Sequence, residues 1–162
     1  MSDAGRPQAT TLEASGISIG IVATRWNADI VDTLVQRARD CTADCGAPEP
    51  TVVYVAGAIE LPVVAQQLAR THDAVAVLGT VIRGGTPHFE YVCDSVTAGL
   101  TRIALDEATP VGNGVLTCDT KEQAVARSGV PGAIEDKGYE AAFAALDAAV
   151  TLRALRAEED GN

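Results

Sequence analysis

A short glycine-rich segment followed by a histidine is the part of the sequence best suited to chemistry. It reads Arg83-Gly84-Gly85-Thr86-Pro87-His88, and an amphipathic stretch follows it. Paired glycines let backbone N–H groups turn toward an anion, and the N-terminus of a following helix adds positive potential. A histidine in the first helical turn can carry protons near neutral pH. The segment therefore predicts a phosphate cradle built by Gly85 and Thr86, with His88 as the catalytic residue.

The surrounding apolar pattern predicts the elements that hold this segment. Strands are expected at residues 17–24, 51–55, 74–78 and 111–118. Helices are expected at about 27–45, 60–71, from 88 onward, at 121–127 and at 137–156. Alternating strands and helices imply right-handed crossovers. The fold class predicted is α/β, a three-layer αβα sandwich with a four-stranded parallel sheet.

Ligands of an open parallel sheet bind beyond the carboxyl ends of its strands, and three segments lie there. Trp26 offers a ring for stacking a flat ligand, with a core position as the alternative. Asn27 is a ligand or simply a helix cap. Gly57, Ala58, Ile59 and Glu60 offer backbone groups and a carboxylate suited to a polyhydroxy chain, although Glu60 at a helix start also complements the dipole. Val81 and Ile82 would line the same edge with apolar surface and backbone hydrogen bonds.

Asn113 does not fit this edge, because it falls near the amino end of the fourth predicted strand. Four or five residues at about 3.3 Å each separate the two edges of the sheet. If Asn113 belongs to the site, a neighbouring subunit must deliver it.

Composition restricts the classes of function. The chain has 162 residues and a net charge of −10, without a basic stripe, so nucleic-acid binding is not expected. No apolar run approaches the length of a membrane span, and no signal-peptide segment follows Met1. The four cysteines lack metal-ligand spacing and are expected to be buried reduced thiols, which favours a cytoplasmic location.

The expected organisation is one domain with short flanking segments. Residues 1–15 are predicted to form a mobile arm, residues 16–157 the α/β domain, and residues 158–162 an acidic solvated tail.

Six blocks of the sequence resemble the lumazine synthase family of riboflavin biosynthesis, in the family's order. They are Thr24–Asn27, Gly57–Pro62, Val81–Tyr91, Asn113–Leu116, Arg127–Gly129 and Asp136–Gly138. The resemblance implies a flavodoxin-like enzyme, a transferase that condenses 5-amino-6-(D-ribitylamino)uracil with 3,4-dihydroxy-2-butanone 4-phosphate. Neither a metal nor an organic cofactor is implied. Homopentamers, or multiples of them, with sites shared between neighbouring subunits are implied, and riboflavin synthase is a candidate partner.

The resemblance also implies roles for single residues. At the position of Trp26 the family commonly has Phe, which holds the pyrimidine, and the block at Gly57–Glu60 holds the ribityl chain. Arg127 resembles the phosphate-binding arginine, and Lys137 matches a position near the site. Two other classes remain open: a non-catalytic flavin- or lumazine-binding shell of the same fold, and a generic flavodoxin-like module that binds phosphate or nucleotides.

Overall fold

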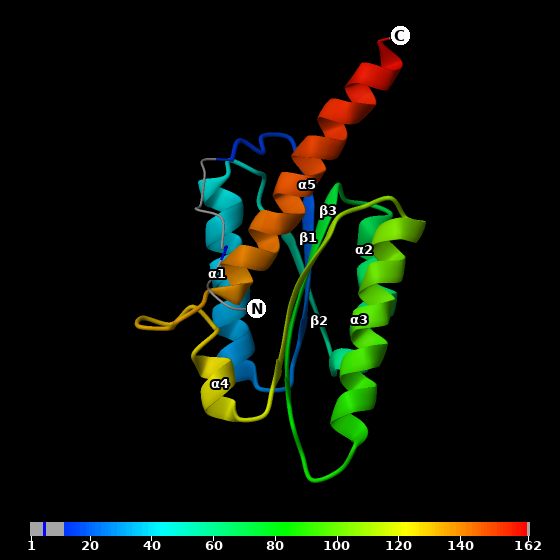
Figure 1. Cartoon of the computed structure of the whole chain (residues 1–162). Coiled ribbons are helices and arrows are strands. Elements are labelled where there is room, and N and C mark those ends of the chain that lie inside the picture. Colours follow the sequence, from blue (N-terminus) through cyan, green and yellow to red (C-terminus); the bar gives the residue numbers. More distant parts are fainter. Residues whose placement is uncertain (1–4, 6–11, 162) are drawn as a thin grey trace.

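The computed structural model describes residue 5 and residues 12–161 of the chain. Its centre is a four-stranded parallel sheet in the order β2-β1-β3-β4 (Figure 1). The strands are β1 (Ile19–Thr24), β2 (Thr51–Val55), β3 (Ala74–Ile82) and β4 (Val111–Cys118). Helices cover both faces, which confirms the predicted αβα sandwich and its flavodoxin-like character.

Each face of the sheet has its own apolar cluster. The helices α1 (Ala28–Asp44) and α5 (Lys137–Asp160) cover one face, and α2 (Leu61–Ala69) and α3 (His88–Asp106) cover the other. Because both faces are covered, all six residues of β1 are buried. The core is built from aliphatic side chains and small residues, as the composition indicates.

Two short helices lie beyond the carboxyl ends of the strands. The 3₁₀ helix η1 (Ala58–Glu60) follows β2, and α4 (Lys121–Val125) follows β4. The hydroxyl of Thr120 accepts a hydrogen bond from the Gln123 amide at 3.2 Å and so caps the N-terminus of α4. The helix expected from Glu60 thus begins with a 3₁₀ turn, and its α-helical part ends at Ala69.

Two glycines allow α5 to approach its neighbours closely. A Cβ atom added to Gly112 of β4 would lie 1.9 Å from the carbonyl oxygen of Ala141, and one added to Gly138 would lie 2.2 Å from that of Leu34. No larger residue fits at either position without a shift of backbone, so α5 rests directly on β4 and α1.

The two ends of the chain differ from expectation. Helix α5 continues to Asp160, so residues 158–160 are helical, because strong helix formers continue to Gly161. Of the predicted arm, residues 1–4 and 6–11 lie outside the described residues, whereas Ala14 is fully buried and its amide donates to the Cys45 carbonyl at 2.8 Å. No helix in the described part of the chain is long and apolar enough to cross a membrane.

Candidate active site

The indole of Trp26 lies on the surface at the carboxyl edge of the sheet, beside the loop after β2. A Cβ atom on Gly57 would lie 3.5 Å from Cδ1 and 3.7 Å from Nε1 of the indole, so the ring packs against that backbone. The side chain is 71% exposed. This exposure rules out a core position for Trp26 and leaves one ring face open to a flat ligand.

Asn27 links the loop after β1 to β3. It occupies the N-cap position of α1 in the left-handed region (φ 55°), which Asn tolerates better than most residues, but its side chain makes no capping hydrogen bond. Instead Nδ2 donates to the Thr80 carbonyl at 3.3 Å. Asn27 is therefore the helix cap of α1 by position, but its side chain braces two of the segments at this edge instead of capping the helix.

The segment from Gly57 to Glu60 closes on itself. The Gly57 amide donates to Oε2 of Glu60 at 2.9 Å, and the Glu60 amide donates to the Gly57 carbonyl at 3.2 Å. The Glu60 carboxylate thus fixes the turn while it remains exposed, and Ile59 is exposed beside it. This turn presents backbone groups and one carboxylate to solvent next to Trp26.

The loop after β3 is open. Residues 84–88 are all exposed, and Cβ atoms added to Gly84 or Gly85 would meet nothing within 4 Å. His88 is the first residue of α3, whose first N–H groups have no partners within the helix. Val81 and Ile82 are half-buried at the end of β3. The geometry leaves room for an anion beside Thr86 and His88.

Arg127 and Lys137 are brought together by Glu135, a residue that was not assigned to the site from the sequence. Oε2 of Glu135 lies 3.1 Å from Nζ of Lys137 and 3.8 Å from Nε of Arg127, and Glu135 is 8% exposed. Lys137 also donates to Glu140 at 2.7 Å. Among the described residues, Glu135 joins the two cations to each other, and no hydrogen bond or ion pair joins either cation to the loop at residues 84–88.

Burial and charge oppose each other in this cluster. Burial alone raises the pKa of Glu135, but Lys137 and Arg127 outweigh it and hold that pKa below the ordinary value. For Lys137, burial lowers the pKa, and Glu140 with Glu135 raises it above the ordinary value. Glu135 is therefore a carboxylate and Lys137 a cation near neutral pH.

Two other polar residues, Asp136 and His72, make hydrogen bonds that hold the fold together. The side chain of Asp136 accepts hydrogen bonds from the Tyr139 amide and from Arg37, so it caps α5 and joins it to α1. The ring nitrogens of His72 contact the Leu68 carbonyl and the Thr51 hydroxyl at the end of α2. Neither Asp136 nor His72 lies in the segments at the carboxyl edge.

Asn113 lies near the amino end of β4, as predicted, opposite Val77 and five residues before Cys118. Its side chain is exposed, and its Oδ1 accepts from the Val115 amide at 3.0 Å. Five strand residues correspond to about 16 Å. Within one chain Asn113 is thus far from the edge at which Trp26 and His88 lie.

Comparison with known proteins agrees with this geometry. The family model for 6,7-dimethyl-8-ribityllumazine synthase matches residues 16–153. The chain belongs to this family. A 6,7-dimethyl-8-ribityllumazine synthase of Saccharopolyspora erythraea is 63% identical over 99% of this chain and 98% of its own length. The enzymes of the same name from Thermobifida fusca and Mycobacterium avium are 62% and 61% identical, over 96% and 95% of this chain and 91% and 96% of their own lengths.

Proposed function

We propose that this chain catalyses the penultimate step of riboflavin biosynthesis. It condenses 5-amino-6-(D-ribitylamino)uracil with 3,4-dihydroxy-2-butanone 4-phosphate to give 6,7-dimethyl-8-ribityllumazine, phosphate and water. The family membership supports the reaction. One observation carries the assignment of the reaction to this site. The Trp26 indole, the Gly57–Glu60 turn and the open loop before His88 all lie at one edge of the sheet.

Each part of this edge suits one part of the substrates. The exposed face of Trp26 stacks on the pyrimidine, a contact worth about 1–3 kcal/mol where bases stack on aromatic rings. Gly57, Ala58, Ile59 and Glu60 bind the ribityl chain through backbone groups and the carboxylate. Asn27, Val81 and Ile82 contact the substrates between these two segments. Gly85 and Thr86 bind the phosphate at the start of α3.

The chemistry follows from holding two reactants together. The substrate amine attacks the ketone, and a first water is lost to form an imine. Phosphate then leaves by elimination, and the second amine adds to the remaining carbonyl and closes the ring with loss of a second water. His88 carries protons in these steps, and an exposed histidine beside a phosphate is suited to that work. Since the reactive amine belongs to the substrate, Lys137 need not form a Schiff base. Positioning supplies much of the rate.

Arg127 and Lys137 supply positive charge in this proposal. The guanidinium of Arg127 also donates to the Gln123 carbonyl at 2.9 Å, and Glu135 lies between the two cations. These contacts hold both side chains in place. A guanidinium suits a phosphate dianion because its N–H groups form a fork. We assign phosphate binding to Arg127 and a supporting role to Lys137.

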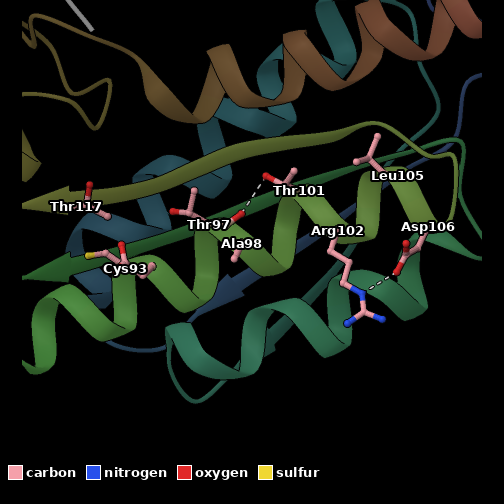
Figure 2. A pocket seen from close by; sticks show the side chains of 9 residues that line it. Cys93, Thr97, Ala98, Thr101, Arg102, Leu105, Asp106 and Thr117 are labelled. Atoms are coloured by element: carbon pink, nitrogen blue, oxygen red, sulfur yellow. Dashed lines mark hydrogen bonds and ion pairs between the residues drawn. The ribbon is translucent and has the colours of Figure 1, made fainter.

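We further propose that the site is shared between subunits of a homopentamer, or of a multiple of pentamers. The position of Asn113 near the amino end of β4 supports this, because only another subunit could bring it to the edge. Beside β4 lies an open groove of about 670 Å³, which is lined by Cys93, Thr97 and Thr101 of α3 and by Thr117 of β4 (Figure 2). Exposed Tyr91 and Leu105 on α3 add apolar surface that a neighbour would cover.

Two further parts of the proposal concern a protein partner and the cellular location. Riboflavin synthase, which consumes the lumazine product, is the expected protein partner, and copurification of the two tests it. A cytoplasmic location is supported by the free state of all four cysteines.

The decisive experiment is an absorbance assay with the purified protein and both substrates, corrected for the slow uncatalysed condensation. Rapid appearance of the lumazine chromophore is expected, together with sedimentation as five chains or a multiple of five. Folded, assembled protein that gives no rate above background would refute the enzyme assignment.

A further inference from the structure

The side chain of Arg83 joins three segments at the carboxyl edge of the sheet. Its Nε donates to Oδ1 of Asp119 at 2.7 Å, and its Nη1 forms an ion pair with Glu90. Its guanidinium carbon lies 4.2 Å from the centroid of the Phe89 ring, the distance of a cation–π contact. One planar group therefore contacts the segment after β4 and the first turn of α3.

These contacts lie at both ends of the open loop. Arg83 directly follows β3, and its amide donates to the Cys118 carbonyl at 2.9 Å, so its backbone is held at the sheet. Phe89 and Glu90 directly follow His88. The loop between them, residues 84–88, is exposed and packs against nothing near its two glycines. The span of the loop is thus set by the groups at its two ends, and Arg83 connects them.

The charge of Arg83 is already satisfied within the chain. The two carboxylates outnumber the guanidinium, and the hydrogen bond with Arg83 is the main reason why the pKa of Glu90 lies below its ordinary value. A guanidinium held by two carboxylates and stacked on a ring is a brace rather than a free anion ligand.

We propose that Arg83 is a positioning residue that fixes the phosphate loop and His88 relative to each other. It acts through Asp119, Glu90 and Phe89 without touching either substrate. The inference rests on the proposed function in taking the butanone phosphate as the ligand of that loop.

The first test compares Arg83→Ala with Arg39→Ala. Arg39 is a matched control, because it is likewise a half-exposed arginine in an ion pair, with Glu49, but on the α1 side of the molecule. We expect Arg83→Ala to weaken binding of inorganic phosphate about tenfold in a ³¹P NMR titration, within the hundredfold range for an ångström-scale misplacement. In Arg83→Ala the KM for the butanone phosphate should also rise about tenfold, whereas the KM for the pyrimidine should change less than about twofold. Arg83→Lys should recover part of the lost phosphate affinity. Equal effects of Arg83→Ala and Arg39→Ala would overturn the proposal.

The second test separates positioning from direct phosphate contact. Asp119→Asn keeps the shape of the side chain, removes a negative charge near the loop and weakens the hold on the guanidinium at its Asp119 end, while Glu90 and Phe89 remain. If Arg83 bound phosphate directly, this variant would bind phosphate as well as the unaltered protein or more tightly. If Arg83 only positions the loop, Asp119→Asn should bind phosphate more weakly than the unaltered protein. The direction of the change in phosphate affinity therefore distinguishes positioning from direct contact, even if Arg83→Ala fails to fold.

The phosphate titration does not depend on catalysis. Unaltered protein that binds no inorganic phosphate would overturn the inference about Arg83. Phosphate binding that is sensitive to Arg83 and Asp119, in a protein without condensation activity, would sustain the inference and remove the proposed function.

Discussion

Replacing Gly138 by alanine tests how the packing of α5 controls the site. The added Cβ would lie 2.2 Å from the Leu34 carbonyl oxygen and 2.8 Å from the Leu34 Cα atom, both in the backbone of α1. Ordinary contacts require about 3.5 Å, so α5 must move by about 1 Å or more. No side-chain rotation relieves the overlap, because backbone lies on the other side.

The magnitude follows from two opposing effects. Overpacking of this kind costs about 1–3 kcal/mol, while alanine in place of glycine in a helix returns up to about 1 kcal/mol. A net loss of about 1–2 kcal/mol in the free energy of unfolding lowers the Tm by roughly 2–8 °C for a chain of this size. Because Lys137 precedes Gly138, the same movement displaces the Lys137–Glu135 contact, and the rate should fall by up to about a hundredfold.

The assay pairs thermal melts with condensation kinetics, and Gly84→Ala is the control for stability. A Cβ on Gly84 would meet nothing within 4 Å, and Gly84 does not adopt a positive φ. That variant should therefore melt at the wild-type temperature or slightly above it, by an effect of about 0.4–1 kcal/mol on the unfolded chain. Indistinguishable melting temperatures for the two variants would refute the close contact between α5 and α1.

Three further predictions concern single side chains. His88→Ala should lower kcat about a hundredfold yet leave it above background, since binding remains, and an unchanged kcat would remove His88 from the mechanism. Arg127→Ala should raise the KM for the butanone phosphate about tenfold and that for the pyrimidine little; equal increases would contradict its role. Glu135, with its lowered pKa, contributes stability that is present above the unfolded pKa of about 4.3 and is lost as pH falls through the folded value. Glu135→Gln should thus lower the Tm at pH 7, and the two melting temperatures should converge below about pH 4; a constant difference from pH 7 to 3 would contradict this.

Local pattern was enough to place the elements and the loop that carries the chemistry. The apolar runs give four strands within two residues of their observed starts, and the glycines before His88 mark the turn into α3. The order of strands and helices fixes a parallel sheet, and a parallel sheet brings the ends of β1, β2 and β3 to one edge. These conclusions depend on residues close together in the chain or on the right-handedness of the crossovers between parallel strands, and both can be predicted from the sequence.

Contacts between distant segments were decided by the tertiary structure. Asn27 reads as a helix cap until the 3.3 Å bond to the Thr80 carbonyl shows that its side chain joins the loop after β1 to β3. The link of Glu135 to Arg127 and Lys137, and that of Arg83 to Asp119, depend on how α4, α5 and β4 pack. Sequence states which charges exist, but pairing among many possible partners depends on distances that only the folded chain sets. For this protein, sequence determines the chemistry available at the edge, and packing determines which side chains hold it in place.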